Sequence, residues 1–302
     1  MARSQISIVD AEGWREAAAG AAAGLPPGAA PGFVEAAAAS LEGAKAVAAV
    51  IKTPKGRIGI PVVIQGGIGQ AMPFGMPAGP VVLEGEPAPI SPGALRRELD
   101  VAELIATVHH TRAGDYPRRA ANQATHVVRL GVDEPRKGYR QRARRKLKAA
   151  EGAEIEVRRG SAADRDRLIE ILAAAAEDAG RALYPDPEVT RAVAAIDEAV
   201  LLFATRDGAE VSAALFLGSP LELFYWQGGT MPAAEEHSPS YAVIDAGARL
   251  AAERGCEFLN LGSSEGLPGV AHFKEGFGAE EVSYPSFSIR SLRYRLRQIR
   301  SR

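Results

Sequence analysis

Cysteine is nearly absent from this sequence: Cys256 is the only one in 302 residues. A single cysteine excludes an internal disulfide and any thiolate metal cluster, and it is weakly typical of a reducing compartment such as the cytoplasm. Net charge is nearly absent too, because 36 basic and 37 acidic residues leave a balance of -1. No field of the whole molecule therefore attracts nucleic acid, although local clusters of cations still can.

Long apolar runs are also missing. No segment reaches the roughly 18 apolar residues that a membrane span needs. The alanine runs at 17–19 and 21–23 follow Asp10, Glu12 and Glu16, whereas a secretory signal begins with basic residues. We therefore expect a cytoplasmic protein without a membrane span.

What is present is typical of an ordinary globular protein, with 46% hydrophobic and 24% charged residues. A chain of 302 residues favours two domains of about 150 residues each. The order strand, two helices, antiparallel strands, helix and strand is expected in both halves. We predict two α/β domains, residues 1–137 and 138–302, joined by a basic helix over residues 139–151.

Hydrophobic periodicity and turn residues place the expected elements. Strands are expected at 5–9, 44–51, 57–64, 125–130, 154–157, 199–205, 211–217, 221–227, 257–261 and 282–289. Helices are expected at 12–24, 33–42, 91–110, 139–151, 163–179, 187–196 and 241–254, with a short one near 272–278 and a basic helical tail at 290–302.

The basic helix has an unusual charge pattern. Six cations fall within nine residues and no acid interrupts them: Arg140, Arg142, Arg144, Arg145, Lys146 and Lys148. Such a run repels itself unless an anion neutralises it, so RNA or a polyphosphate is a fair hypothesis. The alternative is a solvated helix that favours solubility, and the same choice applies to the tail.

Three other candidates for a catalytic or binding site have weaker support in the sequence. Cys256 directly precedes a buried strand, where an inert core thiol is the simpler interpretation. His109 and His110 are adjacent, so on the expected helix their side chains diverge and cannot share a metal. The glycines at 66–69 follow a strand, but prolines stand where a nucleotide-binding loop begins its helix. We expect no metal site.

Aromatic residues gather at the end of one expected strand. Phe224, Tyr225 and Trp226 precede two glycines, and Tyr225 must face away from its two neighbours on a regular strand. One of the two sets can line a cleft. The alternative, an aromatic core, is stronger for Phe224 and Trp226 than for Tyr225.

Lys274 has the most unusual setting of any lysine. It lies between Phe273 and Phe277, with glycines at 276 and 278. A cation among aromatics and glycines suggests a site where a ligand approaches the backbone closely. The alternative is a short amphipathic helix with a solvated lysine.

Three segments together resemble the FemAB-type branch of the GNAT acyltransferase superfamily. They are the basic helix through Gly152, the segment Phe224–Gly229 with Ser238-Pro239-Ser240, and Leu259–Gly262 followed by Phe273–Gly278. The resemblance covers about residues 138–288. The N-terminal half fits by layout only, with Trp14 and Phe33 as its best anchors.

The resemblance implies two tandem GNAT-like domains, each a mixed, mostly antiparallel sheet flanked by helices. It also implies transfer of an acyl group, usually an aminoacyl group from charged tRNA, to an amine. In the family, the lysine that matches Lys274 acts in catalysis, the aromatic beside it contacts the terminal nucleotide of the donor, and the tyrosine that matches Tyr225 lines the acceptor cleft. We therefore predict Lys274 as catalytic. The predicted donor-binding residues are Phe273, Arg142, Arg145, Lys146 and Gly276, and the predicted acceptor-binding residues are Tyr225, Trp226 and Ser240.

Two departures from the family bear on the substrates. The chain has no long coiled-coil insertion, which slightly favours a small-molecule acceptor over a cell-wall precursor. It also has no Gln/Arg-x-x-Gly-x-Gly loop after the aromatic strand, where backbone N–H groups bind the phosphates of CoA. Residues 231–240 stand there instead, with Glu235 and Glu236 among them. An acidic loop disfavours acetyl-CoA.

Three hypotheses follow. The first is an aminoacyl-tRNA-dependent ligase that needs no cofactor besides its charged tRNA. The second is an acyl-CoA-dependent N-acetyltransferase, for which acetyl-CoA stabilises the protein and tRNA has no effect. The third is a non-catalytic RNA-binding module, which binds tRNA with a steep salt dependence whether or not the tRNA is charged.

Overall fold

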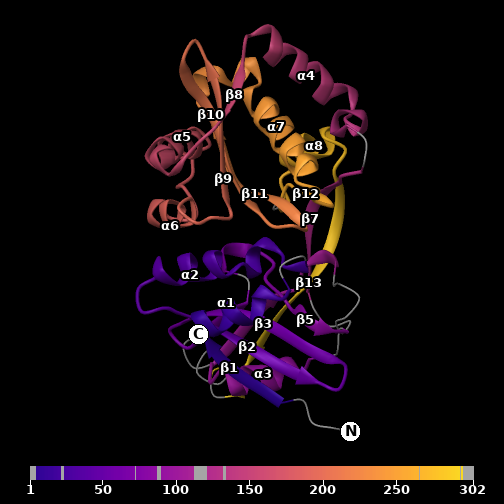
Figure 1. The fold of residues 1–302 in the computed structure, drawn as a ribbon. Helices are drawn as coiled ribbons and strands as arrows, with labels where there is room; N and C mark the ends of the chain where they lie inside the picture. The colour runs from indigo at the N-terminus through magenta and orange to yellow at the C-terminus, as the bar shows by residue number, and fades with distance from the viewer. Residues whose placement is uncertain are drawn as a thin grey trace. The chain divides into compact units, whose positions relative to one another are not determined.

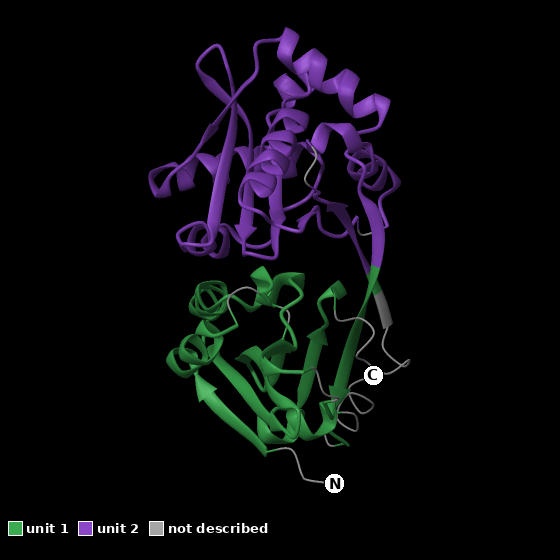
Figure 2. Ribbon diagram, turned by 45° about the vertical axis from the view of Figure 1, so that its right-hand side comes forward, with its two compact units in different colours: residues 1–123, 283–302 green, residues 124–282 purple. Residues whose placement is uncertain are grey.

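The computed structural model describes residues 5–21, 24–71, 73–86, 90–111, 121–131, 134–264, 266–292 and 294. The chain forms two compact units (Figure 2): unit 1 contains residues 1–123 and 283–302, and unit 2 contains residues 124–282. This division differs from the predicted boundary at 137/138, because the C-terminal strand returns to unit 1, where its residues 286–290 pair with another strand.

Unit 1 is a twisted sheet with helices packed on it (Figure 1). Its strands are β1 (Gln5–Asp10), β2 (Lys45–Thr53), β3 (Gly56–Gln65), β4 (Ile68–Ala71), β5 (Val81–Gly85), β6 (Glu103–Thr107) and the end of β13 (Glu280–Arg290). Its helices are α1 (Ala11–Ala19), α2 (Pro31–Ala39), α3 (Pro92–Glu98) and the 3-10 turns η2 (Pro27–Ala29) and η3 (Pro73–Gly75). The order is β1-β2-β3-β4-β6-β13, with β5 also on β3; β4 and β6 are parallel, and the other pairs are antiparallel.

The two expected anchors of the N-terminal half lie in the core of unit 1. Trp14 and Phe33 are fully buried, and the Trp14 indole donates to the Ala29 carbonyl at 3.0 Å. The indole lies flat over Gly59, where a Cβ would overlap the ring. A buried Trp thereby has both its apolar contact and its hydrogen bond satisfied.

Unit 2 contains the remaining strands, with helices on both faces (Figure 1). Its strands are β7 (Ala121–Arg129), β8 (Glu156–Arg159), β9 (Ala199–Arg206), β10 (Ala209–Gly218), β11 (Glu222–Thr230), β12 (Phe258–Asn260) and the start of β13. Its helices are α4 (Gln141–Gly152), α5 (Arg165–Asp178), α6 (Pro187–Val193), α7 (Pro239–Glu253), α8 (Pro268–Gly276) and the 3-10 turns η5 (Pro135–Gly138), η6 (Ala162–Asp164) and η7 (Pro232–His237).

The sheet order of unit 2 is β7-β12-β11-β10-β9-β8. In the described part of this sheet order, β11 and β12 pair in parallel and the other neighbouring strands pair antiparallel. Helix α5 covers one face, where Gly229 of β11 meets Ala175, and α7 covers the other, where Gly247 fits under the ring of Phe216. The predicted class, a mixed and mostly antiparallel sheet flanked by helices, is confirmed.

Two expected elements are wrong. The helix predicted over 91–110 ends at Glu98, because Asp100 adopts a positive φ of 51° and turns the chain. The apolar residues after it belong to strand β6, which is rich in β-branched side chains as strands usually are. The predicted start of the basic helical tail is wrong, because Arg290 is the last residue of β13; Leu292 and Tyr294 are helical, and residues 293 and 295–302 lie outside the described residues.

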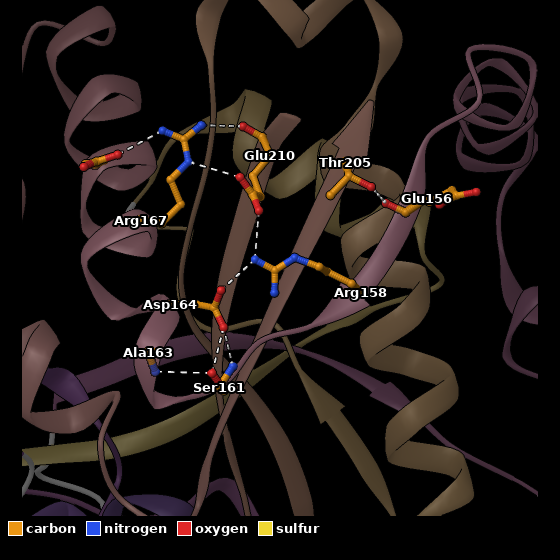
Figure 3. Close-up of polar contacts among 9 residues, drawn as sticks. Glu156, Arg158, Ser161, Ala163, Asp164, Arg167, Thr205 and Glu210 are labelled. Carbon is orange, nitrogen blue, oxygen red and sulfur yellow. Dashed lines mark hydrogen bonds and ion pairs between the residues drawn. The ribbon is translucent and has the colours of Figure 1, made fainter. Parts of the chain in front are cut away.

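A charged network ties one edge of the unit 2 sheet to α5 (Figure 3). Arg158 of β8 donates to Asp164 at 2.7 Å and to Glu210 of β10 at 2.8 Å, and its guanidinium lies 4.6 Å from the centre of the Phe203 ring. Arg167 of α5 pairs with the same Glu210 at 3.5 Å. Asp164 also accepts from the Ser161 backbone N–H at 2.7 Å, which caps the turn before α5.

This network makes the stability of unit 2 sensitive to acid. The hydrogen bond from Arg158 lowers the pKa of Asp164 to about 2, well below the usual range of an aspartate. A carboxylate with a depressed folded-state pKa stabilises the fold above the unfolded-state pKa, and this contribution is lost as pH falls through the folded-state pKa. We expect Asp164→Asn to cost about 1–2 kcal/mol at pH 6 and nothing near pH 2. Urea unfolding of both proteins between pH 2 and 6 measures the difference, and a constant difference over that range would contradict the assignment.

None of the described helices is both long and apolar enough to cross a membrane.

Candidate functional site

The sheet of unit 2 opens between β11 and β12. The two strands pair only over Glu222–Phe224 and Phe258–Asn260, after which β11 continues to Thr230 without β12. The register against β10 skips Trp226, because Leu215 lies opposite Gln227 while Phe216 lies opposite Tyr225. A bulge of this kind bends its strand and re-aims side chains. From Tyr225 onward, β11 therefore borders an opening instead of a neighbouring strand.

Lys274 lies at this opening, and it is buried, with 4% of its surface exposed. Its Nζ donates to the carbonyl oxygens of Gly262 at 3.0 Å and Ser263 at 2.6 Å, in the loop that follows β12. Burying an ammonium is costly unless hydrogen bonds replace its water. The interpretation of Lys274 as a solvated lysine is therefore wrong, and the chain instead holds a cation at a fixed place.

The loop that follows β12 and holds the Lys274 ammonium, residues 262–264, is called the lysine loop here. Gly262 brings this loop close to β11. Its φ of +73° is a left-handed conformation that suits glycine. A Cβ built on Gly262 would lie 3.5 Å from the carbonyl oxygen of Tyr225 and 4.0 Å from Lys274 Nζ. The ammonium and the start of the opening are therefore neighbours, and Lys274 and Tyr225, predicted separately, meet at Gly262.

A buried network of polar side chains holds the start of the lysine loop in place. Asn260 Oδ1 accepts from Thr125 Oγ1 at 2.6 Å and from the Gly262 backbone N–H at 3.0 Å, while its Nδ2 donates to Glu222 at 3.1 Å. Asn260, Thr125 and Glu222 are each at most 1% exposed. A fully hydrogen-bonded network of this kind is rigid, so it fixes where the lysine loop begins.

Phe273 and Gly276 lie on the same short helix as Lys274. The half-buried ring of Phe273 makes edge-to-face contacts with Tyr241 at 4.9 Å and Phe277 at 5.3 Å between ring centroids. Gly276 is buried against Ala143 of α4, and its carbonyl accepts from the Arg140 N–H at 2.8 Å. Gly276 therefore forms part of the contact between α8 and α4, and Phe273 has only part of its ring available to a ligand.

Helix α4 turns its cations outward. Ala143, Leu147 and Ala150 form its buried face. Arg140 pairs with Glu275 of α8 at 3.0 Å, and Arg144 donates to the Lys137 carbonyl at 2.8 Å. Within the described part of the chain, no acidic side chain pairs with the remaining cations of the helix, which are Arg142, Arg145, Lys146 and Lys148.

The predicted acceptor residues lie on β11 and α7. Tyr225 is half-buried, its ring meets Phe216 edge-on at 5.5 Å, and desolvation raises its pKa to about 12. The hydroxyl is directly above Gly228, where any Cβ would overlap it. Trp226 is the half-buried bulge residue, and Ser240 is half-buried in the first turn of α7. The structure joins Tyr225 to the lysine loop, but among the described residues it shows no contact between Ser240 and Lys274.

The N-terminus of α7 differs from a phosphate-binding one. Ser238 takes the N-cap position in a left-handed conformation, with φ of 60°, and its buried hydroxyl caps nothing. Pro239 follows and contributes no N–H. Glu235 and Glu236, both exposed, precede it. Two exposed carboxylates therefore stand where the sequence analysis placed an acidic loop.

Three residues near the site were not predicted. Arg181, in the segment between α5 and α6, lowers the pKa of Tyr225 through its charge, against the larger effect of desolvation, so its guanidinium lies within electrostatic range of that hydroxyl. His126 of β7 and Ser264 of the lysine loop are hydrogen-bonded to each other at 3.2 Å. The sequence offered little signal, because each is a common residue type outside any motif.

The structure also shows the surroundings of Cys256 and of the adjacent pair His109 and His110. Cys256 is buried, and burial raises the pKa of its thiol, as expected for an inert core cysteine. The argument that separated His109 from His110 is wrong, because neither lies on an α-helix and their ring centroids are 4.2 Å apart.

Comparisons with known proteins agree with this geometry. Residues 136–275 match the family model described as an acetyltransferase (GNAT) domain. FemX matches over 88% of this chain and 92% of its own, with 11% identity and a TM-score of 0.67. A C-terminal domain from Agrobacterium fabrum, described as belonging to a lysylphosphatidylglycerol synthetase, matches over 96% of both chains, with 12% identity and a TM-score of 0.59.

A tandem GNAT protein from the clavulanic acid biosynthesis pathway also matches, over 95% of this chain and 98% of its own, with 12% identity and a TM-score of 0.52. A search of curated protein sequences gives no match. At these identities the structural likenesses establish the fold.

Residues 136–275, which form most of unit 2, therefore carry an acetyltransferase (GNAT) domain. The fold of the chain is like that of FemX and of the tandem GNAT protein, as the sequence resemblance predicted.

Proposed function

We propose that this protein transfers an aminoacyl group from aminoacyl-tRNA to the amine of a small metabolite or a cell-wall precursor, in the cytoplasm. The observation that carries the proposal is the contact between α8, which holds Lys274, and α4, which bears Arg142, Arg145 and two lysines without acidic partners. A polyanionic donor bound along α4 is thereby next to the helix that holds the buried ammonium.

The chemistry of this donor suits the site. An aminoacyl ester is already activated, so the enzyme needs mainly to align the amine and to stabilise the charge that develops on the carbonyl oxygen. Lys274 supplies positive charge beside the opening of the sheet, and the available part of Phe273 offers a surface on which the terminal adenine stacks. Arg142, Arg145 and Lys146 contact phosphates.

The acceptor side is formed by Tyr225, Trp226 and Ser240. Arg181 adds a cation near the Tyr225 hydroxyl, and no described side chain forms an ion pair with it. A cation without a partner suits an acceptor that carries a carboxylate or a phosphate beside its amine.

The α4 cations give a prediction about salt. Each phosphate contact releases a counterion, and the slope of log K against log salt falls by about 0.7–0.9 for each contact removed. We expect Arg142→Ala and Arg145→Ala each to weaken binding of charged tRNA and to reduce the slope by nearly 1 in filter binding at 50–200 mM salt.

The matched control is Arg191→Ala. Arg191 is a half-buried arginine of α6 that is already paired with Asp166 at 3.0 Å and with Glu188. Arg191→Ala should change neither the affinity for charged tRNA nor the slope of log K against log salt. Equal slopes in all three variants would remove α4 from the binding surface.

The second candidate function is acyl-CoA-dependent N-acetylation. The description of the matching family model, an acetyltransferase domain, favours it. The acidic approach to α7 and Pro239 oppose it. Thermal unfolding with acetyl-CoA or with charged tRNA separates the two functions. A ligand that binds the folded protein raises its melting temperature, so only the true donor should do so.

A further inference from the structure

Three side chains of unit 2 form a row from the lysine loop to the surface. Ser264 Oγ and His126 Nδ1 are 3.2 Å apart, and His126 Nε2 is 3.9 Å from Glu281 Oε2. Ser264 is 7% exposed and His126 is 1% exposed, whereas the Glu281 side chain is 64% exposed. The row therefore begins in the loop that holds Lys274, passes through a buried imidazole and ends in solvent.

The backbone holds this row in place. The His126 N–H donates to the Gly262 carbonyl at 3.1 Å, and the Leu261 N–H donates to the His126 carbonyl at 2.7 Å. Gly262 O also accepts from Lys274. One carbonyl thus accepts from both the His126 backbone and the Lys274 ammonium, which places the two residues beside each other.

The surroundings of the imidazole favour its neutral form. Burial lowers the pKa of His126, and the charge of Lys274 lowers it further, while Glu281 and Glu275 act in the opposite direction without reversing the shift. His126 is therefore neutral at pH 7. With its proton on Nε2, the ring accepts from Ser264 at Nδ1 and presents an N–H to Glu281, so a single tautomer satisfies both contacts.

We propose that Ser264, His126 and Glu281 form a proton relay that carries the proton of the acceptor amine from the acyl-transfer site to solvent. The inference rests on the proposed acyl transfer, and it holds for an ester or a thioester donor alike. An alkylammonium must lose one proton before its nitrogen can attack an acyl carbon.

The proton of the acceptor amine leaves the site by successive transfers along the row. The ammonium N–H bond breaks and its proton passes to Ser264 Oγ, while the Ser264 hydroxyl proton passes to His126 Nδ1. The imidazolium releases its Nε2 proton to Glu281 and solvent, and tautomer exchange of the ring completes the cycle. In the transfer itself, the new C–N bond forms as the C–O or C–S bond breaks, and the second amine proton leaves with the departing oxygen or sulfur.

A comparison of two amines tests the relay. Total aminoacyl-tRNA and, separately, acetyl-CoA serve as donors, with glycinamide as a protonated amine and hydroxylamine as an amine that is mostly uncharged at neutral pH. We expect Ser264→Ala to lower kcat for glycinamide about 100-fold and to spare hydroxylamine, since loss of acid–base help costs roughly 10²–10⁴-fold. Glu281→Gln should act in the same sense, and Glu280→Gln, at the neighbouring exposed position, should not. Equal losses with both amines, or no loss with either, would overturn the relay.

A second measurement needs no activity. Nitrogen-15 spectra of the histidines report the tautomer of His126, assigned with His126→Gln. We expect the Nε2–H tautomer at pH 7 and a changed Nδ1 signal in Ser264→Ala. An Nδ1–H tautomer, or an imidazolium at pH 7, contradicts the relay even if tRNA and acetyl-CoA both prove inert. Inert donors with the expected tautomer would instead count against the proposed function alone.

Discussion

Replacing Lys274 with Met should lower acyl transfer by about 10²–10³-fold in kcat, the loss typical of removing one electrostatic contact to a developing oxyanion. Methionine keeps most of the apolar stem and removes the ammonium that donates to the Gly262 and Ser263 carbonyls. The charge is already desolvated and held in place, so it costs no reorganisation during the reaction. Single-turnover transfer from charged tRNA measures the chemical step directly.

The control for Lys274→Met is Lys52→Met, an exposed lysine of β2 in unit 1, which should transfer at the wild-type rate. Circular dichroism and thermal unfolding show whether the buried substitution preserves the fold. A folded Lys274→Met protein with full activity would make the lysine a purely structural support of its loop, and the catalytic role would then be rejected.

Asp245→Asn should cost about 1–3 kcal/mol of stability, between the losses expected for exposed and for fully buried ion pairs, because the carboxylate is buried while its two arginine partners are partly exposed. The Asp245 carboxylate is 1% exposed and accepts from Arg136 at 3.0 and 2.8 Å, in a two-pronged contact. Arg249 adds a third donor at 3.2 Å. Asparagine keeps the shape but removes the anion that the two guanidinium groups share, and it leaves Arg136 paired with Glu151.

Glu151→Gln is the matched control, because Glu151 accepts from the same Arg136 at 3.0 Å but is 58% exposed. An exposed pair contributes about 0–1 kcal/mol, so the two variants should differ several-fold in urea unfolding. Similar losses would show that burial does not set the strength of this contact. Since Arg136 stands in the turn before α4, Asp245→Asn should also weaken binding of charged tRNA.

Most elements were predictable because their sequences carry strong local signals. Apolar runs predicted β2 and β3, and the turn with Gly56, whose φ is +148°, predicted the hairpin between them. The cationic run of α4 is compatible only with an exposed helix face, and Ala143, Leu147 and Ala150 supply the opposite face. Local periodicity is enough where one face is buried and the other is solvated.

Long-range contacts were not predictable in the same way. The Lys274 ammonium donates to two backbone carbonyls that lie more than ten positions away in the sequence. Backbone groups leave no trace in side-chain patterns, so these contacts could not be predicted. The wrong helix after Glu98 has a similar origin, since the pairing of β6 with β13, which lies far away in the sequence, outweighs the local helical period. His126 was missed because a single histidine in an apolar strand resembles any core residue.

The return of β13 to unit 1 has a consequence for synthesis on the ribosome. Strand β6 ends at Thr107, but its partner residues 286–290 emerge only after the whole of unit 2 has been translated. Domains generally fold as they leave the ribosome, N-terminal parts first. Here the N-terminal sheet waits with an open edge beside β6, so the contiguous unit 2 is free to fold first and unit 1 is completed last.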